Sequence, residues 1–161
     1  ACMTSRKNMQ NAHIHAQMRG LHTALMKIVG TMNNPDRDEM MVREAGIPLD
    51  RALFPLLVSI ERRGPIGVVD LANGVGRDYT TVSRQVAKLE SLGLVERQAD
   101  SGDRRVRTAT VTPRGKQMTD AVDTARARIG ERIFQDWESE DIEALMRLMT
   151  RFADDIDRAT T

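Results

Sequence analysis

The chain has 161 residues, a mass of 18.0 kDa and a formal net charge of +1, which suits one domain with helical extensions. Hydrophobic residues make up 40% and charged residues 29% of it, a composition that excludes wholesale disorder and a membrane-embedded protein. The longest apolar run, ALFPLLVSI, is too short to span a bilayer. Because the amino end also lacks the apolar core of a secretion signal, we expect a cytoplasmic protein with no membrane partner.

A long helix is predicted near the start of the chain. Residues 1–9 are polar and are expected to be disordered. The following residues, about 10–31, are predicted to form a helix, because apolar side chains recur at alternating spacings of three and four: Met18, Leu21, Leu25, Ile28 and Met32. The stretch NNPDRDE should break this helix.

A second helix is predicted between Asp50 and Arg63. Asp50 is a suitable N-cap, and the dipeptide Gly64-Pro65 is a suitable stop. Pro55 falls inside or just past the first turn, so we expect it to cost one backbone hydrogen bond there.

Two short helices are predicted next, at VVDLANGVG and YTTVSRQVAKLESLG, with Asp78 as N-cap of the second and Gly93 at its end. The segments LVERQA and VRTATVT alternate apolar and polar side chains and predict a two-stranded hairpin. The stretch QADSGDRRVR, between and partly within these strands, places three arginines around one glycine-containing turn.

The last part of the chain is predicted to be helical. Thr112-Pro113 is a typical helix start, and Ser139 is the expected cap of a final helix. That final helix has an apolar stripe made of Ile142, Leu145, Met149, Phe152 and Ile156. Because the longest stripes belong to the two ends of the chain, residues 10–32 and 113–159 are predicted to form a helical dimerisation region of a homodimer.

The order of helix, short helix, turn, second helix and hairpin is typical of a winged helix-turn-helix. We therefore expect a mainly α fold with a small β wing, in which residues 50–112 form the DNA-binding region and the second short helix enters the major groove. That helix offers polar side chains to DNA at Thr80, Thr81, Ser83, Arg84, Gln85 and Lys88.

Charge is divided unequally along the chain. Residues 77–116 contain nine basic and five acidic side chains, whereas residues 134–161 contain three basic and eight acidic ones. One end of the molecule should therefore attract polyanions, and the other should repel them.

The segment from Asp70 to Lys116 resembles the multiple-antibiotic-resistance regulator (MarR) family. The similarity rests on residues at the spacing of that family: Leu71-Ala72, Thr81-Val82-Ser83-Arg84, Leu89, Gly93-Leu94-Val95, Arg97, Asp103-Arg104-Arg105, Thr112 and Gly115. The resemblance implies a dimeric repressor or activator that binds a pseudo-palindromic DNA operator. It also implies that Asp103 holds Arg105 for insertion into the minor groove, while Arg104 and Arg107 lie along the phosphates.

In this family a small molecule often releases the operator by binding between the dimer helices and the winged domain. The resemblance places such a pocket near His22, Met26, Phe54, Leu57 and Tyr79. Because aromatic residues make up only 3% of the chain, we expect a lining of Met and Leu and a small apolar or phenolic effector. Core packing is an alternative role for the apolar members of this set.

Other function classes have weaker support in the sequence. The three histidines lie in one amino-terminal segment without a cysteine beside them, and no phosphate-binding glycine-rich loop exists, so we expect neither an enzyme nor a cofactor or metal. The remaining alternative is a winged helix used for protein contacts or for non-specific DNA packing. The basic groove-facing side chains argue against the first, and the acidic carboxy-terminal region argues against the second.

Overall fold

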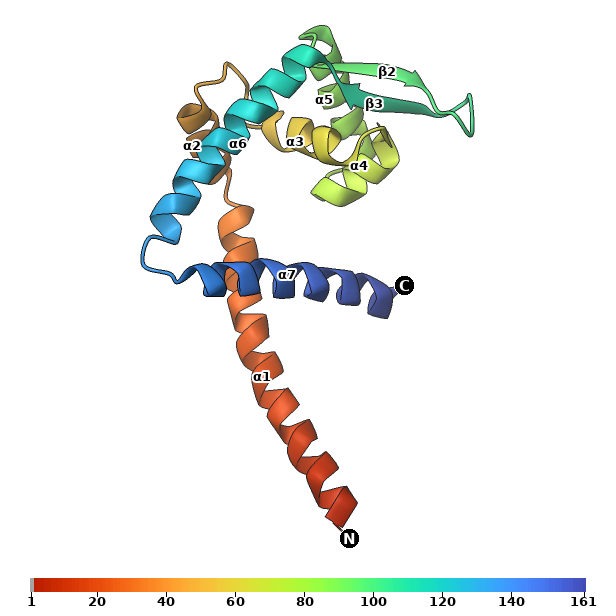
Figure 1. The fold of residues 1–161 in the computed structure, drawn as a ribbon. Coiled ribbons are helices and arrows are strands. Elements are labelled where there is room, and N and C mark those ends of the chain that lie inside the picture. The colour runs from red at the N-terminus through yellow and green to blue at the C-terminus, as the bar shows by residue number, and fades with distance from the viewer. Residues whose placement is uncertain (1) are drawn as a thin grey trace.

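The structure, a computed structural model, describes residues 2–161. A winged domain lies at one end, and long helices run away from it (Figure 1). Helix α1 (Cys2–Met32) leads into α2 (Pro35–Ala45), and the winged domain begins with α3 (Phe54–Arg63). Helices α6 (Pro113–Ile133) and α7 (Ser139–Thr160) close the chain. The prediction of a mainly α fold with a small β wing is therefore confirmed.

The winged domain combines three helices with one small sheet. Helices α4 (Val68–Val75) and α5 (Tyr79–Ser91) follow strand β1 (Ile66–Gly67). Strands β2 (Val95–Ala99) and β3 (Arg107–Val111) form the hairpin, and the antiparallel sheet has the order β1-β3-β2. The pairs Val95 with Val111 and Ala99 with Arg107 fix the hairpin register. Strand β1 is short and was not predicted, because two residues carry no periodicity.

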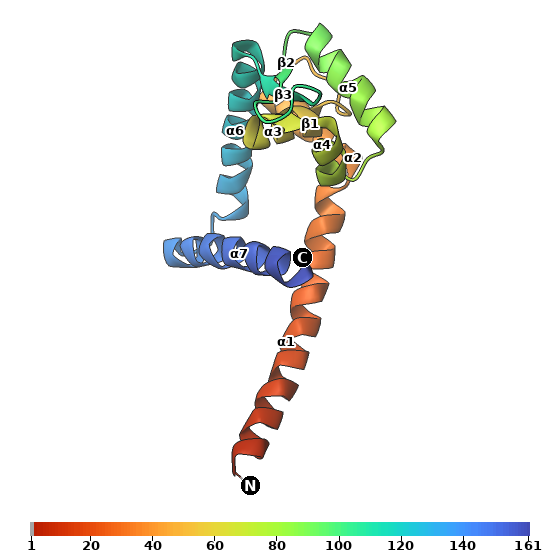
Figure 2. The same ribbon diagram turned by 90° about the vertical axis from the view of Figure 1, so that its right-hand side faces the viewer.

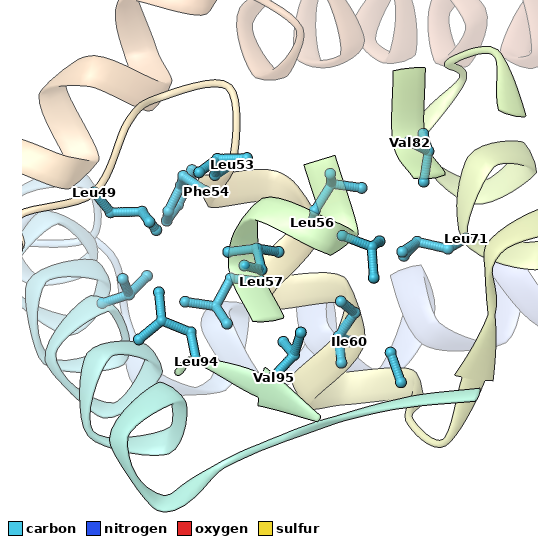
Figure 3. Close-up of a cluster of buried hydrophobic side chains, with 14 of the residues drawn as sticks. Leu49, Leu53, Phe54, Leu56, Leu57, Ile60, Leu71, Val82, Leu94 and Val95 are labelled. Carbon is cyan, nitrogen blue, oxygen red and sulfur yellow. The ribbon is translucent and has the colours of Figure 1, made fainter. Parts of the chain in front are cut away.

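The hydrophobic core lies between these helices and the sheet (Figure 3). It draws side chains from each element of the winged domain, including Leu56, Leu57, Ile60, Leu71, Val82, Leu94 and Val95. Leu56 and Leu71 are fully buried, as is Val82 on α5. Because α5 contributes to this core, its orientation is set by the same side chains that stabilise the domain.

Local signals fix the ends of the helices around the hairpin. The Asp78 carboxylate accepts hydrogen bonds from the Thr81 N–H at 2.9 Å and from the Thr81 hydroxyl at 2.7 Å, which confirms the predicted N-cap of α5. Helix α5 ends before Gly93, whose φ of 73° is readily adopted only by glycine. The Thr112 hydroxyl caps α6 by accepting from the Gly115 N–H at 3.1 Å and donates to the Gly93 carbonyl at 2.6 Å.

Gly115 lies where the first turn of α6 meets the start of the wing. A Cβ atom at this position would overlap the carbonyl oxygen of Leu94. The Thr112 N–H donates to that same oxygen at 3.0 Å. Only a glycine lets α6 approach the strand backbone this closely, so the junction between the wing and α6 is tightly defined.

The amino-terminal half differs from the sequence prediction in two ways. Helix α1 begins at Cys2, so residues 2–9, expected to be disordered, are helical; this segment has no proline or glycine, although its polar character gave no helical stripe. Helix α2 was not predicted, because Pro35 was interpreted as a breaker. Pro35 instead occupies the first turn behind the N-cap Asn34, where its missing N–H costs nothing. Ala1 lies outside the described residues.

Two predicted helix starts were also misplaced. Helix α3 begins at Phe54, and Asp50 instead accepts a hydrogen bond from the Ala52 N–H at 2.7 Å in the preceding turn. Pro55 therefore lies in the first turn of α3, where its N–H would have no helical acceptor, and the expected loss of a bond does not occur. The last helix has Glu138 rather than Ser139 at its N-cap, without a side-chain cap bond.

Helices α1 and α7 have no extensive packing partner within the described part of the chain. Figure 2 shows α1 and α6 descending from the winged domain on opposite sides, and together with Figure 1 it shows that α7 does not run along α1. No residue of α7 is buried, and Met18, Ile28 and Met149 are among the large apolar side chains left exposed. These apolar faces are available to another molecule.

Candidate nucleic-acid interface

Helix α5 presents one buried and one polar face. Val82, Val86 and Leu89 are buried in the core. Of the six side chains on α5 that are predicted to contact DNA, Thr80, Arg84 and Lys88 are exposed, whereas Thr81, Ser83 and Gln85 are half-buried. The Thr81 hydroxyl is bound to Asp78, and this hydrogen bond is the main cause that lowers the pKa of the Asp78 carboxyl. Thr81 therefore stabilises the helix cap. Thr80 and Arg84 are the more exposed of the predicted contact residues in the first two turns of α5.

Gln85 is held by an arginine that the sequence analysis did not single out. Its side-chain carbonyl accepts a hydrogen bond from Arg77 Nη1 at 3.0 Å, and the same nitrogen donates to the Ala52 carbonyl at 2.7 Å. Arg77 lies in the turn between α4 and α5 and is half-buried. It thereby joins the segment before α3 to the helix predicted to read DNA. The only sequence signal was a basic residue within the turn Gly76-Arg77-Asp78.

The wing presents the predicted arginines to solvent. Figure 1 shows the β2–β3 hairpin projecting from the winged domain, and Arg104, Arg105 and Arg107 are exposed at and near its tip. Within the described residues none of these guanidinium groups makes a salt bridge. Cations with no carboxylate partner are free to bind an external anion.

Asp103 shapes the wing tip through the backbone. Its carboxylate accepts a hydrogen bond from the Arg105 N–H at 2.9 Å, while the Asp103 carbonyl accepts from the Val106 N–H at 3.1 Å. The family resemblance implied that Asp103 holds Arg105, and in this structure it holds the main chain of Arg105 rather than the guanidinium. Such a turn orients the Arg105 side chain without neutralising it.

A hollow of about 520 Å³ separates the first turns of α5 from the wing. We call it the wing hollow; its polar lining consists of Asp70, Tyr79, Ser83, Arg97, Arg105 and Arg107. Arg97, on β2, is half-buried, and its Nη2 atom is buried without a hydrogen-bond partner. Arg97 belonged to the family-like spacing but not to the predicted DNA contacts.

The five residues expected to form an effector pocket do not come together. His22 and Met26 are exposed on α1, and Tyr79 is 56% exposed in the wing hollow. Leu57 is 1% exposed and belongs to the core, which is the alternative role considered for it. Only Phe54, also buried in the core, lines a cavity near the end of α1 and α6.

That cavity has a volume of about 810 Å³ and lies between the end of α1, α3, the turn after α4, and α6. We call it the inter-helix cavity; its lining includes Met32, Phe54, Val58, Asp38, Arg77 and Arg126. Burial raises the pKa of the Asp38 carboxyl, against the opposing effect of Arg77, Arg37 and Arg51. Burial also lowers the pKa of Arg126. The lining is thus more charged than the Met and Leu lining that was expected.

Two further features concern residues 2–161, namely metal-binding clusters and membrane-spanning helices. No group of three or more histidine, cysteine, aspartate or glutamate side chains in this range is arranged to hold a metal ion. No helix in the same range is both long and apolar enough to cross a membrane.

Comparisons with known proteins agree with this geometry. Residues 49–107 match the model of the MarR family. Over 103 residues the chain is 34% identical to the uncharacterized HTH-type transcriptional regulator YxaD of Bacillus subtilis (strain 168), covering 64% of this chain and 72% of that protein.

Solved structures show the same fold. The crystal structure of MarR has a TM-score of 0.66 at 25% identity, with 85% of this chain and 91% of that chain covered. A MarR family protein from Bacillus stearothermophilus has a TM-score of 0.70 at 19% identity, with 89% of this chain and 97% of that chain covered. The match between winged domain, exposed basic wing and these relatives leads to one conclusion: the chain belongs to the MarR family of DNA-binding transcriptional regulators.

Proposed function

We propose that this regulator is a homodimeric repressor that binds a pseudo-palindromic operator and leaves it when a small molecule binds. The supporting observation is the exposed surface shared by α5 and the wing. Thr80, Arg84 and Lys88 are exposed on α5, and three wing arginines are free of salt bridges within the described residues. Polar side chains on an inserted helix can read base edges, whereas wing cations supply affinity through phosphates and the minor groove.

Dimerisation is supported by the unpartnered apolar faces of α1 and α7. Met18 is 50% exposed, Ile28 46% and Ile156 42%, and the exposed apolar side chains of each helix repeat at helical spacing. A second copy of the chain would remove these faces from water. Two-fold symmetry would then present two α5 helices to successive major grooves, about 34–36 Å apart, which requires a pseudo-palindromic operator.

Release by a small molecule is supported by the position of the inter-helix cavity. The end of α1 lines this cavity on one side, and the turn between α4 and α5 lines it on the other. Arg77 lines this cavity and also binds Gln85 on α5, so a ligand that attracts or displaces Arg77 acts on the recognition helix without touching DNA. A coupling of about 1–3 kcal/mol would weaken operator binding roughly 5- to 150-fold.

The ligand proposed for this cavity is small and apolar or phenolic. Met32, Phe54 and Val58 offer apolar contacts, while Asp38 and Arg77 offer partners for one polar group. A panel of such compounds should include members that release operator DNA and raise the melting temperature of the free protein. Val58→Phe, which places a larger side chain in the cavity lining, should weaken both responses, whereas Met40→Phe, outside the cavity lining, should preserve them. Retention of both responses in Val58→Phe would place the ligand elsewhere.

Sequence-specific binding is tested by selecting fragments of the source genome on the purified protein and sequencing them. We expect retained fragments to share a two-fold symmetric site. Competition with excess random DNA then separates the alternatives: a repressor keeps its site, an architectural protein is displaced, and a winged helix devoted to protein contacts retains no DNA at all.

A further inference from the structure

We propose that the wing hollow is a phosphate site in which Arg97 binds a phosphate group of the DNA backbone. The proposal rests on the proposed DNA-binding function and adds a contact to it. Arg97 is neither on the recognition helix nor at the wing tip. It lies on β2, where it pairs with Ala109 of β3.

The first argument is the state of the Arg97 side chain. Its Nη2 atom has no protein hydrogen-bond partner, although it is buried. Arginine stays charged at all physiological pH values, and a buried guanidinium donor without an acceptor is costly. The described residues form no salt bridge with Arg97. Because the Arg97 side chain is only half-buried and lines the hollow, it can turn this donor toward an acceptor there, and a negatively charged acceptor suits it.

The second argument is the lining around Arg97. Arg105 and Arg107 line the same hollow, so its lining contains three arginines and one acidic residue, Asp70. Ser83 and Tyr79 add hydroxyl groups that can donate from the opposite wall, on α5. A phosphate has several acceptor oxygens and pairs with a guanidinium in a bidentate geometry. The donor set therefore fits a phosphate better than a carboxylate or a neutral ligand.

The third argument is position. The hollow lies between α5, proposed to enter the major groove, and the wing, proposed to reach the minor groove. The sugar-phosphate backbone separates these two grooves, so it must pass between the two elements when both are engaged. A phosphate held at Arg97 would fix the insertion depth of α5 relative to the wing. It would add affinity and register without reading sequence.

The experiment compares the salt dependence of DNA binding by the wild-type protein and Arg97→Met, which keeps the length of the side chain and removes its charge. Loss of one phosphate contact should lower the slope of log K against log salt concentration by about 0.9. Affinity should fall by the same factor for operator and random duplexes. Arg151→Met, which removes an exposed cation on α7, is the matched control and should leave the slope unchanged. An unchanged slope in Arg97→Met would overturn the DNA assignment.

A second variant keeps the test decisive if Arg97→Met does not fold. Arg97→Lys retains the charge but loses the two-pronged donor geometry. It should bind both duplexes several-fold more weakly with the wild-type slope. Wild-type affinity in Arg97→Lys would overturn the bidentate geometry of this contact, because a lysine ammonium group binds a phosphate as a point charge.

A free anion is the other source of the same chemistry. Inorganic phosphate, compared with chloride at equal ionic strength, should raise the melting temperature of the free wild-type protein but not that of Arg97→Met if the hollow binds phosphate by itself. This result without a slope change would assign the hollow to a free anion rather than to DNA. If neither the rise in melting temperature nor the change in slope is observed, the proposed site is overturned. Failure of the wild-type protein to bind any DNA would instead reject the proposed function, and the phosphate titration would still judge the hollow.

Discussion

Arg77 Nη1 donates to the Gln85 side chain at 3.0 Å and, at the same time, to the Ala52 carbonyl at 2.7 Å. One nitrogen thus holds together the segment before α3, the helix-turn-helix turn and the recognition helix. The same side chain lines the inter-helix cavity. Arg77 consequently connects the proposed effector cavity with the helix that is predicted to contact DNA.

Arg77→Met should lower the free energy of unfolding by about 1–3 kcal/mol, because it leaves a partly buried carbonyl and amide without their donor. Gln85→Ala removes only one of the two hydrogen bonds and should cost less. Urea unfolding of both variants measures the difference. Equal losses in the two variants would show that the bond to Ala52 contributes nothing.

Arg84→Ala should remove the preference for operator over random DNA, at a cost of about 1–3 kcal/mol if Arg84 makes a bidentate base contact. Arg104→Ala, at the wing tip, should instead weaken both kinds of binding alike. Fluorescence anisotropy with labelled operator and random duplexes distinguishes the two. A uniform loss in Arg84→Ala would make Arg84 a phosphate contact.

Arg105→Ala should weaken binding most on operators with A·T-rich flanks, since a narrow minor groove rewards an inserted guanidinium there. The turn at Asp103 orients this side chain through its backbone, so the guanidinium is not already neutralised. The comparison needs matched operators with A·T and G·C flanks. Identical losses on both would limit the wing to phosphate contacts.

Leu145→Asp combined with Phe152→Asp should give a monomer or a poorly folded chain, because two carboxylates would be buried without partners in the proposed interface. Arg147→Asp combined with Arg151→Asp places the same groups on the opposite face of α7 and should leave the dimer intact. Sedimentation velocity reports the mass of each. An unaltered dimer in the first variant would move the interface away from α7.

Asp38→Asn should stabilise the protein near neutral pH. Burial raises the pKa of the Asp38 carboxyl above its ordinary value of 3.8, so the folded state binds the proton more tightly than the unfolded state does. Ionisation of Asp38 therefore destabilises the folded protein as the pH rises through the raised pKa. The advantage of Asp38→Asn should shrink below that window and vanish near pH 3.8, as followed by thermal melting across pH. A constant difference at all pH values would exclude this cause.

Local signals predicted much of the winged domain, because each depends on a few neighbouring residues. Asp78 caps α5 and Thr112 caps α6, as their positions indicated. Pro35 was misjudged because a proline within a first turn and a helix-breaking proline look alike until the N-cap is known. The residues expected to contact DNA stay predictions.

The effector residues were harder to place because a pocket depends on tertiary packing. Leu57 and Met26 both lie on helices with apolar spacing, yet Leu57 is buried and Met26 is 63% exposed. Arg77 and Arg97 were overlooked for a related reason. Their importance lies in hydrogen bonds made or missing across the fold, and the sequence spacing, which included Arg97, did not show these bonds.

The close approach of Gly115 to the Leu94 carbonyl joins the first turn of α6 closely to the start of the wing. Because the backbones meet with no side chain between them, we expect α6 and the start of the wing to move together. A helix of 21 residues is about 30 Å long. A tilt of a few degrees at its distal end, where α7 begins, would therefore shift the wing by about an ångström or more on the duplex. We therefore expect motion among the distal helices to be transmitted through α6, at Gly115, to the winged domain.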